Sequence, residues 1–318
     1  MPVLVYIETQ GEEIKKSSLE LASYGRAIAD AKNTPLIAVS FGLKDGSTLS
    51  EYGVNKHYSV TLEEDLNFNA ERFSSSLVEI ASQEEADLIL VSASANGRYL
   101  GPIAAAKFKA GYFSNVIGLP LSYDPIQVKR SCFTNKAFSQ SVSNKEKNIL
   151  SLSSNSFGIH TKTAEMNEVV IPITPASSAL EVLSIEKSLD QVTIADADIV
   201  VSGGRGLKGP ENWHLIEDLA TVLGAATACS KPVSDLGWRP HSEHVGQTGK
   251  PVASNLYIAI GVSGAIQHLA GINSSKVKVV INSDPEAPFF KAADYGVVGD
   301  AFEVVPELIS KLKALKEA

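Results

Sequence analysis

Residues 256–272 read LYIAIGVSGAIQHLAGI, an apolar run followed by glycines, a serine and the first turns of a helix. The run at 256–261 predicts a β-strand, and the segment from about residue 265 predicts a short α-helix. A strand that passes through a tight turn into a helix is the repeating unit of α/β proteins. This stretch therefore favours an α/β fold, and it raises the question of which ligand the glycine-rich turn binds.

The same alternation extends through the first half of the chain. Three apolar runs predict strands and alternate with three helical patterns: strands at 2–8, 35–41 and 87–93, and helices at 18–31, 66–82 and 99–110. From VIGLP at 116–120 to VVIPITP at 169–175 the chain reads as several further β segments with polar turns. Strands that alternate with helices predict βαβ units and a parallel sheet.

The second half restarts this pattern after a polar stretch without clear alternation. Its predicted elements are strands at 197–204, 256–261, 277–282 and, shorter, in YGVVGD at 295–300, with helices at 211–223, from 265 and at 307–316. We place the domain boundary near 186–195 and predict two domains, 1–190 and 191–318. Each is expected to be an α/β domain built on a largely parallel sheet with flanking helices.

Length, composition and charge limit the possible functions. The 318 residues suffice for two domains that each bury a core, and 44% hydrophobic with 20% charged residues is typical of a globular protein. The 28 Lys and Arg against 36 Asp and Glu give a formal charge of −8, and the absence of a basic stripe argues against binding to nucleic acid. The apolar runs end before the roughly 18–20 residues that a spanning helix needs, so we expect no membrane insertion.

The N-terminus and the cysteines indicate the compartment. The opening MPVLVYIETQGEE has no basic n-region and no Arg- and Ser-rich amphipathic character, so we expect no presequence and a cytoplasmic bacterial protein. Cys132 and Cys229 are far apart, without CxxC or zinc spacing. They argue against a disulfide framework, an iron–sulfur cluster or a structural zinc.

The stretch VSGGRGLKG contains Gly204, Gly206 and Gly209, a G-x-G-x-x-G directly after a predicted strand. Such glycines can let the backbone approach a pyrophosphate, with a helix N-terminus supplying positive potential. Here, however, the helix begins only after Pro210, and Arg205 stands inside the motif. A dinucleotide site and a glycine-rich structural turn both remain open, and Arg205 suggests a cation aimed at a phosphate or a flat ring.

The loop RPHSEHVGQTGK (239–250) contains two histidines three residues apart, His241 and His244. A metal could be bound by such a pair, but without a third His or Cys nearby a solvated loop is the more common arrangement. Gln247 and Thr248 lie between glycines, so their amides and side chains can face a ligand. The alternative is an ordinary polar turn.

In GVSGAIQHLAG, Ser263 or Gly264 is expected to cap a helix whose free N–H groups attract anions. His268 in the first turn is either a structural residue or lies near the developing negative charge of a reduced cofactor, where its cationic form is stabilising. Asn282 and Asp300 follow β-like runs, where polar groups can meet a ribose or an adenine as well as cap or turn the chain.

Taken together, five segments resemble the alpha subunit of electron transfer flavoprotein in family order and spacing. They are SGGRGLKGPENW (202–213), ACSKPVSDLGW (228–238), VGQTGK (245–250), PVASNLYIAIGVSGAIQHLAGI (251–272) and VVINSDPEAPFFKAADYGVVGDAFEVVPEL (279–308). The first half is similar to that family more loosely, through DLILVSASANGRYLGPIAAAKFKAG (87–111) and AGYFSNVIGLP (110–120). The resemblance thus covers roughly the whole chain and is most specific in its second half.

The resemblance implies a redox carrier rather than a substrate-converting enzyme. It implies one FAD held mainly by 191–318, a Rossmann-like FAD-binding domain, and a heterodimer with a beta subunit contacted by 1–190, a domain with a nucleotide-hydrolase-like fold. The flavin then takes electrons from dehydrogenases such as acyl-CoA dehydrogenases, in fatty acid β-oxidation, and passes them to a membrane quinone oxidoreductase. Both redox partners would dock only transiently.

The resemblance also implies which residues contact FAD. They are Arg205, Ser230, Lys231, Val245, Gly246, Gln247, Thr248, Ser263, Gly264, Ala265, Ile266, Gln267, His268, Asn282, Asp300 and Ala301. By family analogy Thr248 hydrogen-bonds flavin N5, and His268 faces the N1 and C2 carbonyl region. Asn282 and Asp300 then lie toward the adenosine half.

Lys231 departs from the family pattern, which usually has Ser-Arg where this chain has Ser230 and Lys231. A Lys ammonium lacks the planar guanidinium that can lie flat over a conjugated ring. Because a cation near N1 and a hydrogen bond at N5 favour the anionic one-electron form of a flavin, this departure bears on the potential more than on FAD binding.

Three other functions remain as alternatives. The chain could be the alpha subunit of an electron-bifurcating flavoprotein that uses NADH, a choice that depends largely on the beta subunit. It could be a self-sufficient NAD- or FAD-dependent oxidoreductase, although no Ser/His/Asp set, paired carboxylates or redox dithiol stands out. It could also be a binding protein that lost the cofactor, against which the joint presence of Arg205, Thr248 and His268 argues.

Overall fold

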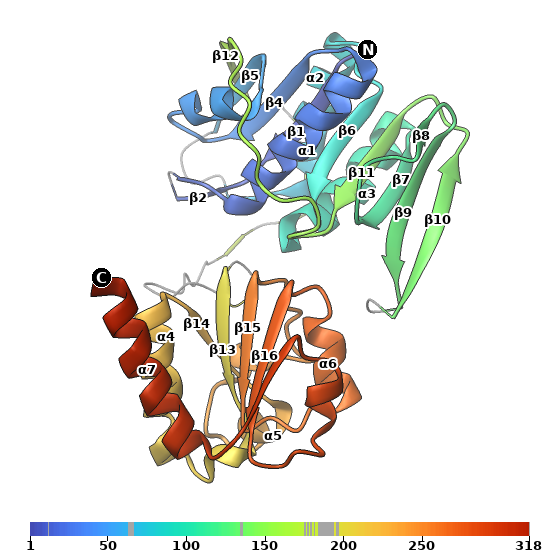
Figure 1. The fold of residues 1–318 in the computed structure, drawn as a ribbon. Helices are drawn as coiled ribbons and strands as arrows, with labels where there is room; N and C mark the ends of the chain where they lie inside the picture. The colour runs from blue at the N-terminus through green and yellow to red at the C-terminus, as the bar shows by residue number, and fades with distance from the viewer. Residues whose placement is uncertain are drawn as a thin grey trace. The chain divides into compact units, whose positions relative to one another are not determined.

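The computed structural model describes residues 1–11, 13–62, 67–133, 136–174, 176, 178, 180, 182–183, 194 and 197–317. The chain forms two compact units, the first of Met1–Phe133 and Ala137–Glu186 and the second of Thr134–Lys136 and Lys187–Ala318 (Figure 1). The predicted boundary between residues 190 and 191 lies outside the described residues. Each unit is an α/β structure with a mainly parallel sheet, so the predicted fold class is confirmed.

The first unit is built on a ten-stranded sheet with the order β10-β9-β7-β11-β6-β1-β4-β5-β12, in which β8 pairs with β9. In this spatial order, every pair of neighbouring strands from β7 through β11, β6, β1, β4 and β5 to β12 is parallel. The pairs β7–β9, β9–β10 and β8–β9 are antiparallel. The strands are β1 Val3–Ile7, β4 Leu36–Phe41, β5 Lys56–Thr61, β6 Leu88–Ser92, β7 Gly111–Val116, β8 Ser122–Tyr123, β9 Ile126–Cys132, β10 Ala137–Ser143, β11 Asn148–Leu152 and β12 Asn167–Pro172; β2 Thr9–Gln10 and β3 Glu13–Ile14 form a separate pair.

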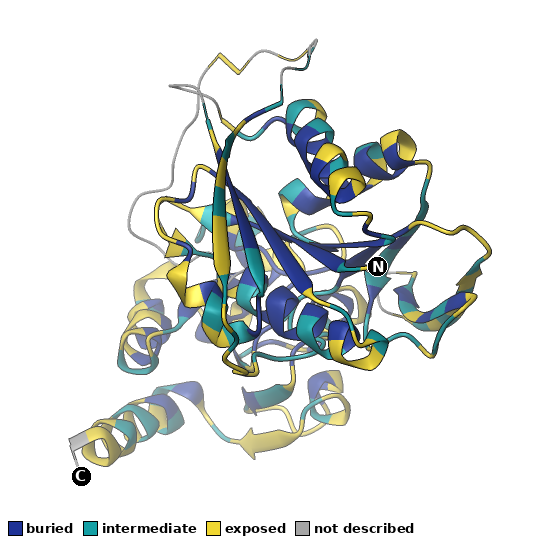
Figure 2. Ribbon diagram, turned by 90° about the horizontal axis from the view of Figure 1, so that it is seen from above, coloured by how far each residue is buried: buried dark blue, intermediate teal, exposed yellow. Residues whose placement is uncertain are grey.

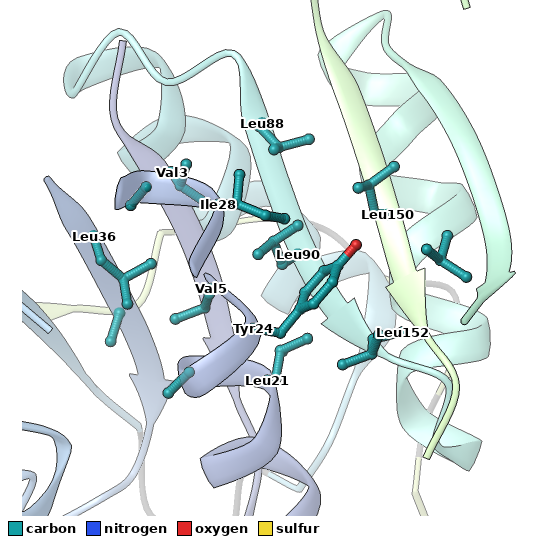
Figure 3. Close-up of a cluster of buried hydrophobic side chains, with 14 of the residues drawn as sticks. Val3, Val5, Leu21, Tyr24, Ile28, Leu36, Leu88, Leu90, Leu150 and Leu152 are labelled. Atoms are coloured by element: carbon teal, nitrogen blue, oxygen red, sulfur yellow. The ribbon is translucent and has the colours of Figure 1, made fainter. Parts of the chain in front are cut away.

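Helices cover both faces of this sheet, which is why its central strands are apolar throughout. All residues of β1, β4, β6 and β11 are buried, as expected for a parallel sheet with two covered faces (Figure 2). On one face α1 (Lys16–Lys32) packs Leu21, Tyr24 and Ile28 against the strands (Figure 3). On the other face lie α2 (Ala70–Gln83), capped by Asn69, and α3 (Ala95–Phe108), capped by Ser94.

The second unit has a five-stranded, fully parallel sheet with the order β14-β13-β15-β16-β17. The strands are β13 Ile199–Gly203, β14 Ala226–Cys229, β15 Leu256–Ile260, β16 Val277–Asn282 and β17 Tyr295–Val298. Numbered along this unit, the order is 2-1-3-4-5, a doubly wound arrangement. The strand order reverses between β13 and β15, because the chain passes from β13 to one side and later returns to the other.

Three helices pack on one side of the second sheet and one short helix packs on the other. The helices α4 (His214–Leu223) and α7 (Ala301–Glu317) bury their apolar faces with Val201, Ile258 and Ile281 of the strands. The helix α5 (Lys231–Asp235) follows β14 and buries Val233 in the same core as α4 and α7. The short helix α6 (Ile266–Ile272) packs in the opposite core with Tyr257 and Phe289. Short 3-10 turns complete the unit at Arg205–Leu207, Pro210–Asn212, His241–Glu243 and Pro288–Lys291.

Several elements differ from the prediction for identifiable reasons. The strands β5 and β14 and the helix α5 were not predicted, because KHYSVT mixes polar with apolar residues and ATAC and KPVSD are only four and five residues long. The last helix begins at Ala301 rather than near residue 307, since Asp300 Oδ1 accepts the Phe302 N–H (3.0 Å) and Pro306 is accommodated within the helix. No helix of the described chain is both long and apolar enough to span a membrane.

Candidate cofactor site

A cavity of about 550 Å³ lies at the carboxyl ends of the strands of the second unit. Arg205 and Gly206 line it after β13, and Gly261 and Ser263 line it after β15, so it lies where the strand order reverses. Lining residues also follow the neighbouring strand β16, at Asn282. Doubly wound sheets bind their ligands in the crevice outside this point, and the volume falls in the range of small-molecule sites.

The glycines of the G-x-G-x-x-G motif hold two loops of this crevice together. A Cβ on Gly204 would overlap the carbonyl oxygen of Gly261, and the Gly206 N–H donates to the same oxygen at 3.1 Å. Gly261 itself has φ of 63°, a conformation that favours glycine. The sequence left a dinucleotide site and a glycine-rich structural turn as alternatives, and the structural turn accounts for Gly204 and Gly206. Arg205 and Gly206 also line the cavity.

His268 of α6 brings a buried imidazole to the cavity. The hydroxyl of the fully buried Tyr257 lies 2.9 Å from His268 Nε2, and burial raises the pKa of that tyrosine, which stays protonated. In the tautomer in which Tyr257 donates to Nε2, the proton of the neutral ring is on Nδ1. No described residue is a hydrogen-bond partner of Nδ1, so a ligand acceptor would satisfy it.

Without a ligand, the surroundings of His268 favour its neutral form over the cationic form expected beside a reduced cofactor. Burial and, to a smaller extent, His244 lower the pKa of His268 to about 4. The ring is therefore neutral at physiological pH, because the described surroundings do not compensate the desolvation of a positive charge. What His268 offers to a ligand is an N–H donor rather than a full charge.

The turn before α6 also differs from the expectation. The N-cap residue is Ala265, without a side-chain hydrogen bond, so neither Ser263 nor Gly264 caps the helix. Gly264 has φ of 85°, and a Cβ there would overlap the backbone of Phe289. The predicted cap was wrong because Gly264 is required for this close backbone approach.

The loop 244–250 and α5 form the remaining walls. Gln247 N–H donates to the carbonyl of Gln267 at 2.8 Å and ties the loop to α6, and Val245 N–H donates to Cys229 O at 3.0 Å. Ser230 precedes α5 and is buried, whereas Lys231 is exposed at the first helical position. Lys231 and Arg205 thus contribute positive charge to a crevice with an exposed side.

The structure brings together most of the residues assigned from sequence. Twelve of the sixteen line the cavity: Arg205, Ser230, Lys231, Val245, Gly246, Gln247, Thr248, Ser263, Ala265, Gln267, His268 and Asn282. Four lie outside its lining: Gly264 packs on Phe289, Ile266 is 71% exposed, Asp300 precedes α7 beside Lys208, and Ala301 is buried as the first residue of α7.

The cavity also contains residues that the sequence analysis did not assign. Two carboxylates, Asp235 and Asp284, line it, as does the buried His244, which the sequence analysis had considered only as half of a metal pair. The rings of His241 and His244 are instead 5.8 Å apart and stacked, and Ser234 Oγ is 2.8 Å from His241 Nδ1. A signal for His244 was present in its position directly before VGQTGK.

Comparison with known proteins follows the division into two units. The sequence profile of the electron transfer flavoprotein domain matches residues 3–178, and that of the electron transfer flavoprotein FAD-binding domain matches residues 193–273. The electron transfer flavoprotein subunit alpha of Bacillus subtilis is 33% identical over 320 residues, which covers 98% of each chain. The chain belongs to the electron transfer flavoprotein alpha subunit family.

Other relatives of the electron transfer flavoprotein alpha family agree. The subunit alpha of Syntrophomonas wolfei is 34% identical, over 97% of this chain and 98% of its own. That of Paracoccus denitrificans is 51% identical over 150 residues, 47% of this chain and 48% of its own. The chain is thus an FAD-binding electron carrier subunit, and the cavity lies in its FAD-binding domain.

The residues of the cavity fit an FAD. The buried Nδ1 of His268 has no hydrogen-bond partner among the described residues. A carbonyl oxygen or ring nitrogen of a flavin can be that acceptor. Arg205 and Lys231 suit a pyrophosphate or an electron-rich ring. The loops after β13 and β15, which the glycine contacts bring together, line this cavity.

Proposed function

We propose that this chain holds one FAD in the cavity of its second unit and relays electrons from dehydrogenases, such as acyl-CoA dehydrogenases, to a membrane quinone oxidoreductase. It acts in the bacterial cytoplasm as a heterodimer with an electron transfer flavoprotein beta subunit and converts no small substrate itself. The observation that carries the proposal is the cavity at the strand-order reversal, where twelve of the sixteen assigned residues gather.

In this proposal, different residues contact different parts of the FAD. His268 donates from Nδ1–H to the flavin edge with N1 and the C2 carbonyl, and Thr248 donates to N5. Bound FAD supplies a ring that accepts and releases electrons one or two at a time. Because these donors are held by α6 and its loop before an electron arrives, they stabilise negative charge on the ring without reorganisation.

The two domains have different roles in the proposal. Residues 191–318 hold the cofactor, with Asn282 and Asp300 assigned to its adenosine half. Residues 1–190 hold the beta subunit, as expected for a unit whose sequence profile is that of the electron transfer flavoprotein domain. The cofactor and the partner are therefore bound by separate parts of the chain.

The test is purification of the chain together with the beta subunit encoded beside it. We expect a yellow heterodimer whose FAD is reduced by an acyl-CoA dehydrogenase and its substrate, and reoxidised by a quinone oxidoreductase. A colourless complex would contradict the proposal. Steady turnover of a small substrate by this chain alone would favour a self-sufficient oxidoreductase, and NADH-driven reduction of two acceptors would favour bifurcation.

A further inference from the structure

His244 lines the cavity but has no role in the site described so far. Its side chain is buried, and its ring lies beside two glycines of its own loop. A Cβ on Gly246 would stand 3.4 Å from His244 Nε2, and one on Gly249 would stand 2.9 Å from Nδ1. The two glycines therefore leave the space that the imidazole occupies, and a side chain at residue 249 would displace it.

The backbone of His244 fixes the ring in this position. Its N–H donates to His241 O (3.2 Å), and its carbonyl accepts from Lys250 N–H (2.9 Å). A parallel bridge joins it to Cys229 at the end of β14. Within the described residues its hydrogen bonds are made by this backbone, which leaves the ring nitrogens for a group inside the cavity.

The charged and titratable groups around His244 come from three helical elements and β14. Burial lowers the pKa of His244, and the neighbouring His241 and Lys231 lower it further, while Asp235 opposes them. His268 of α6 interacts with it, and its own pKa is lowered to about 4. The thiol of Cys229 stays protonated, since its pKa is raised to about 12.

The charge of the cavity lining is balanced before any ligand binds. Two cations, Arg205 and Lys231, oppose two carboxylates, Asp235 and Asp284. An electron added to a flavin in this cavity is therefore an extra negative charge that the fixed groups do not neutralise. A nearby negative charge favours the protonated form of an imidazole.

We propose that His244 is the proton-accepting group of the site and takes up one proton from solvent when the bound FAD takes up one electron. The inference rests on the proposed function, which provides FAD in the cavity and a reduced dehydrogenase as the electron donor. No bond to the cofactor forms or breaks, because the electron goes to the flavin ring and the proton to a ring nitrogen of His244. His268 is less suited, since Tyr257 occupies its Nε2.

The test is the one-electron potential of the FAD in the heterodimer, measured with redox mediators between pH 5.5 and 8. Uptake of one proton per electron makes the potential fall by about 59 mV per pH unit, the equivalent of a tenfold change in proton concentration. We expect this slope at the acidic end and a plateau at the alkaline end. We expect His244→Gln to abolish the slope and keep the FAD, because the amide keeps polarity but does not titrate.

His241→Gln is the matched control, since His241 is exposed and outside the cavity lining. It should keep the wild-type slope. A wild-type potential that is independent of pH, or a slope that persists in His244→Gln, overturns the inference alone. Loss of FAD in both His244→Gln and His244→Asn also overturns it, because the imidazole would then be a structural contact. A colourless wild-type heterodimer overturns the proposed function and the inference with it.

Discussion

The two units of this chain have the same kind of sheet but differ at the point where the strand order reverses. In the first unit the order reverses between β1 and β6, and Glu8 follows β1 while Ser94 follows β6. Glu8 is buried there, with Lys15 at 3.5 Å and Ser94 Oγ donating to its Oε1. In the second unit the reversal between β13 and β15 opens into the cavity.

The comparison shows what turns a strand-order reversal into a ligand site. In the first unit the polar groups at the reversal satisfy one another: Ser18 Oγ accepts from Glu8 N–H (2.7 Å) and donates to Glu8 O (3.0 Å). In the second unit His268 Nδ1 has no hydrogen-bond partner among the described residues, and the exposed Arg205 lines the same cavity. A ligand can provide the hydrogen bond that the protein leaves open at the second reversal.

The largest expected effect comes from adding a side chain at Gly204, where its backbone packs against that of Gly261. Gly204→Ala places a Cβ on the carbonyl of Gly261, and we expect it to cost about 3 kcal/mol of stability in the second unit and to abolish FAD binding. Urea unfolding followed by tryptophan fluorescence measures this, because both tryptophans, Trp213 and Trp238, lie in the second unit.

Gly237→Ala is the control for Gly204→Ala. Gly237 has φ of 74° but open space around it, so alanine there costs only the left-handed strain, about 1 kcal/mol. We expect this variant to keep its FAD. If Gly204→Ala binds FAD as the wild type does, the contact between the two loops is not what shapes the cavity.

The next largest effect concerns the strand-order reversal of the first unit, where the polar groups bond to one another. Glu8→Ala removes the buried carboxylate and leaves Ser94 and Lys15 without it, so we expect a loss of about 2 kcal/mol with no change in FAD content. Circular dichroism during thermal unfolding and the flavin absorbance of the heterodimer measure the two quantities. The exposed Glu13→Ala is the control and should change neither. A loss of FAD from Glu8→Ala would show that the two reversals are not independent.

A smaller effect is expected from the loss of His268 at the strand-order reversal of the second unit. His268→Ala removes the Nδ1–H donor, and we expect the one-electron potential to fall by on the order of 50 mV, close to a tenfold change, while FAD affinity changes less. Tyr257→Phe keeps the imidazole but removes the hydroxyl that is hydrogen-bonded to its Nε2, so it should lower the potential by a smaller amount. Potentiometry that finds the couple unmoved in His268→Ala would rule out this role of His268.

The smallest effect is expected from Lys231→Arg. The charge is unchanged, but a planar guanidinium can lie over a conjugated ring, so we expect a shift in the flavin spectrum and a change in potential of about 20 mV. Lys250→Arg, outside the cavity lining, is the control. An unchanged spectrum and potential in Lys231→Arg would mean that this side chain does not reach the ring.

The strands with apolar runs could be predicted from sequence, whereas the arrangement of the reversal could not. The run at 256–261 became β15 at Leu256–Ile260, because a strand buried on both faces is apolar at every position. The strand β14, only four residues long, and the 2-1-3-4-5 order depend on contacts between distant segments. No periodicity encodes these contacts.

The site was predictable as a set of motifs but not in its chemistry. The resemblance assigned Arg205 and His268, and both line the cavity. It did not indicate that His268 is neutral, because this depends on burial and on Tyr257, which is eleven residues away in sequence. His244 was missed for a similar reason, since its place in the cavity depends on how Gly246 and Gly249 fold around it.

Amide hydrogen exchange of the heterodimer, measured with and without FAD, tests the contrast between the two reversals most directly. We predict that FAD protects the loops of the second unit at residues 204–206, 245–248 and 262–268, and leaves the exchange at Glu8 and at the start of α3 unchanged. Protection at Glu8 and Ser94, or no protection in the three loops of the second unit, would contradict the account.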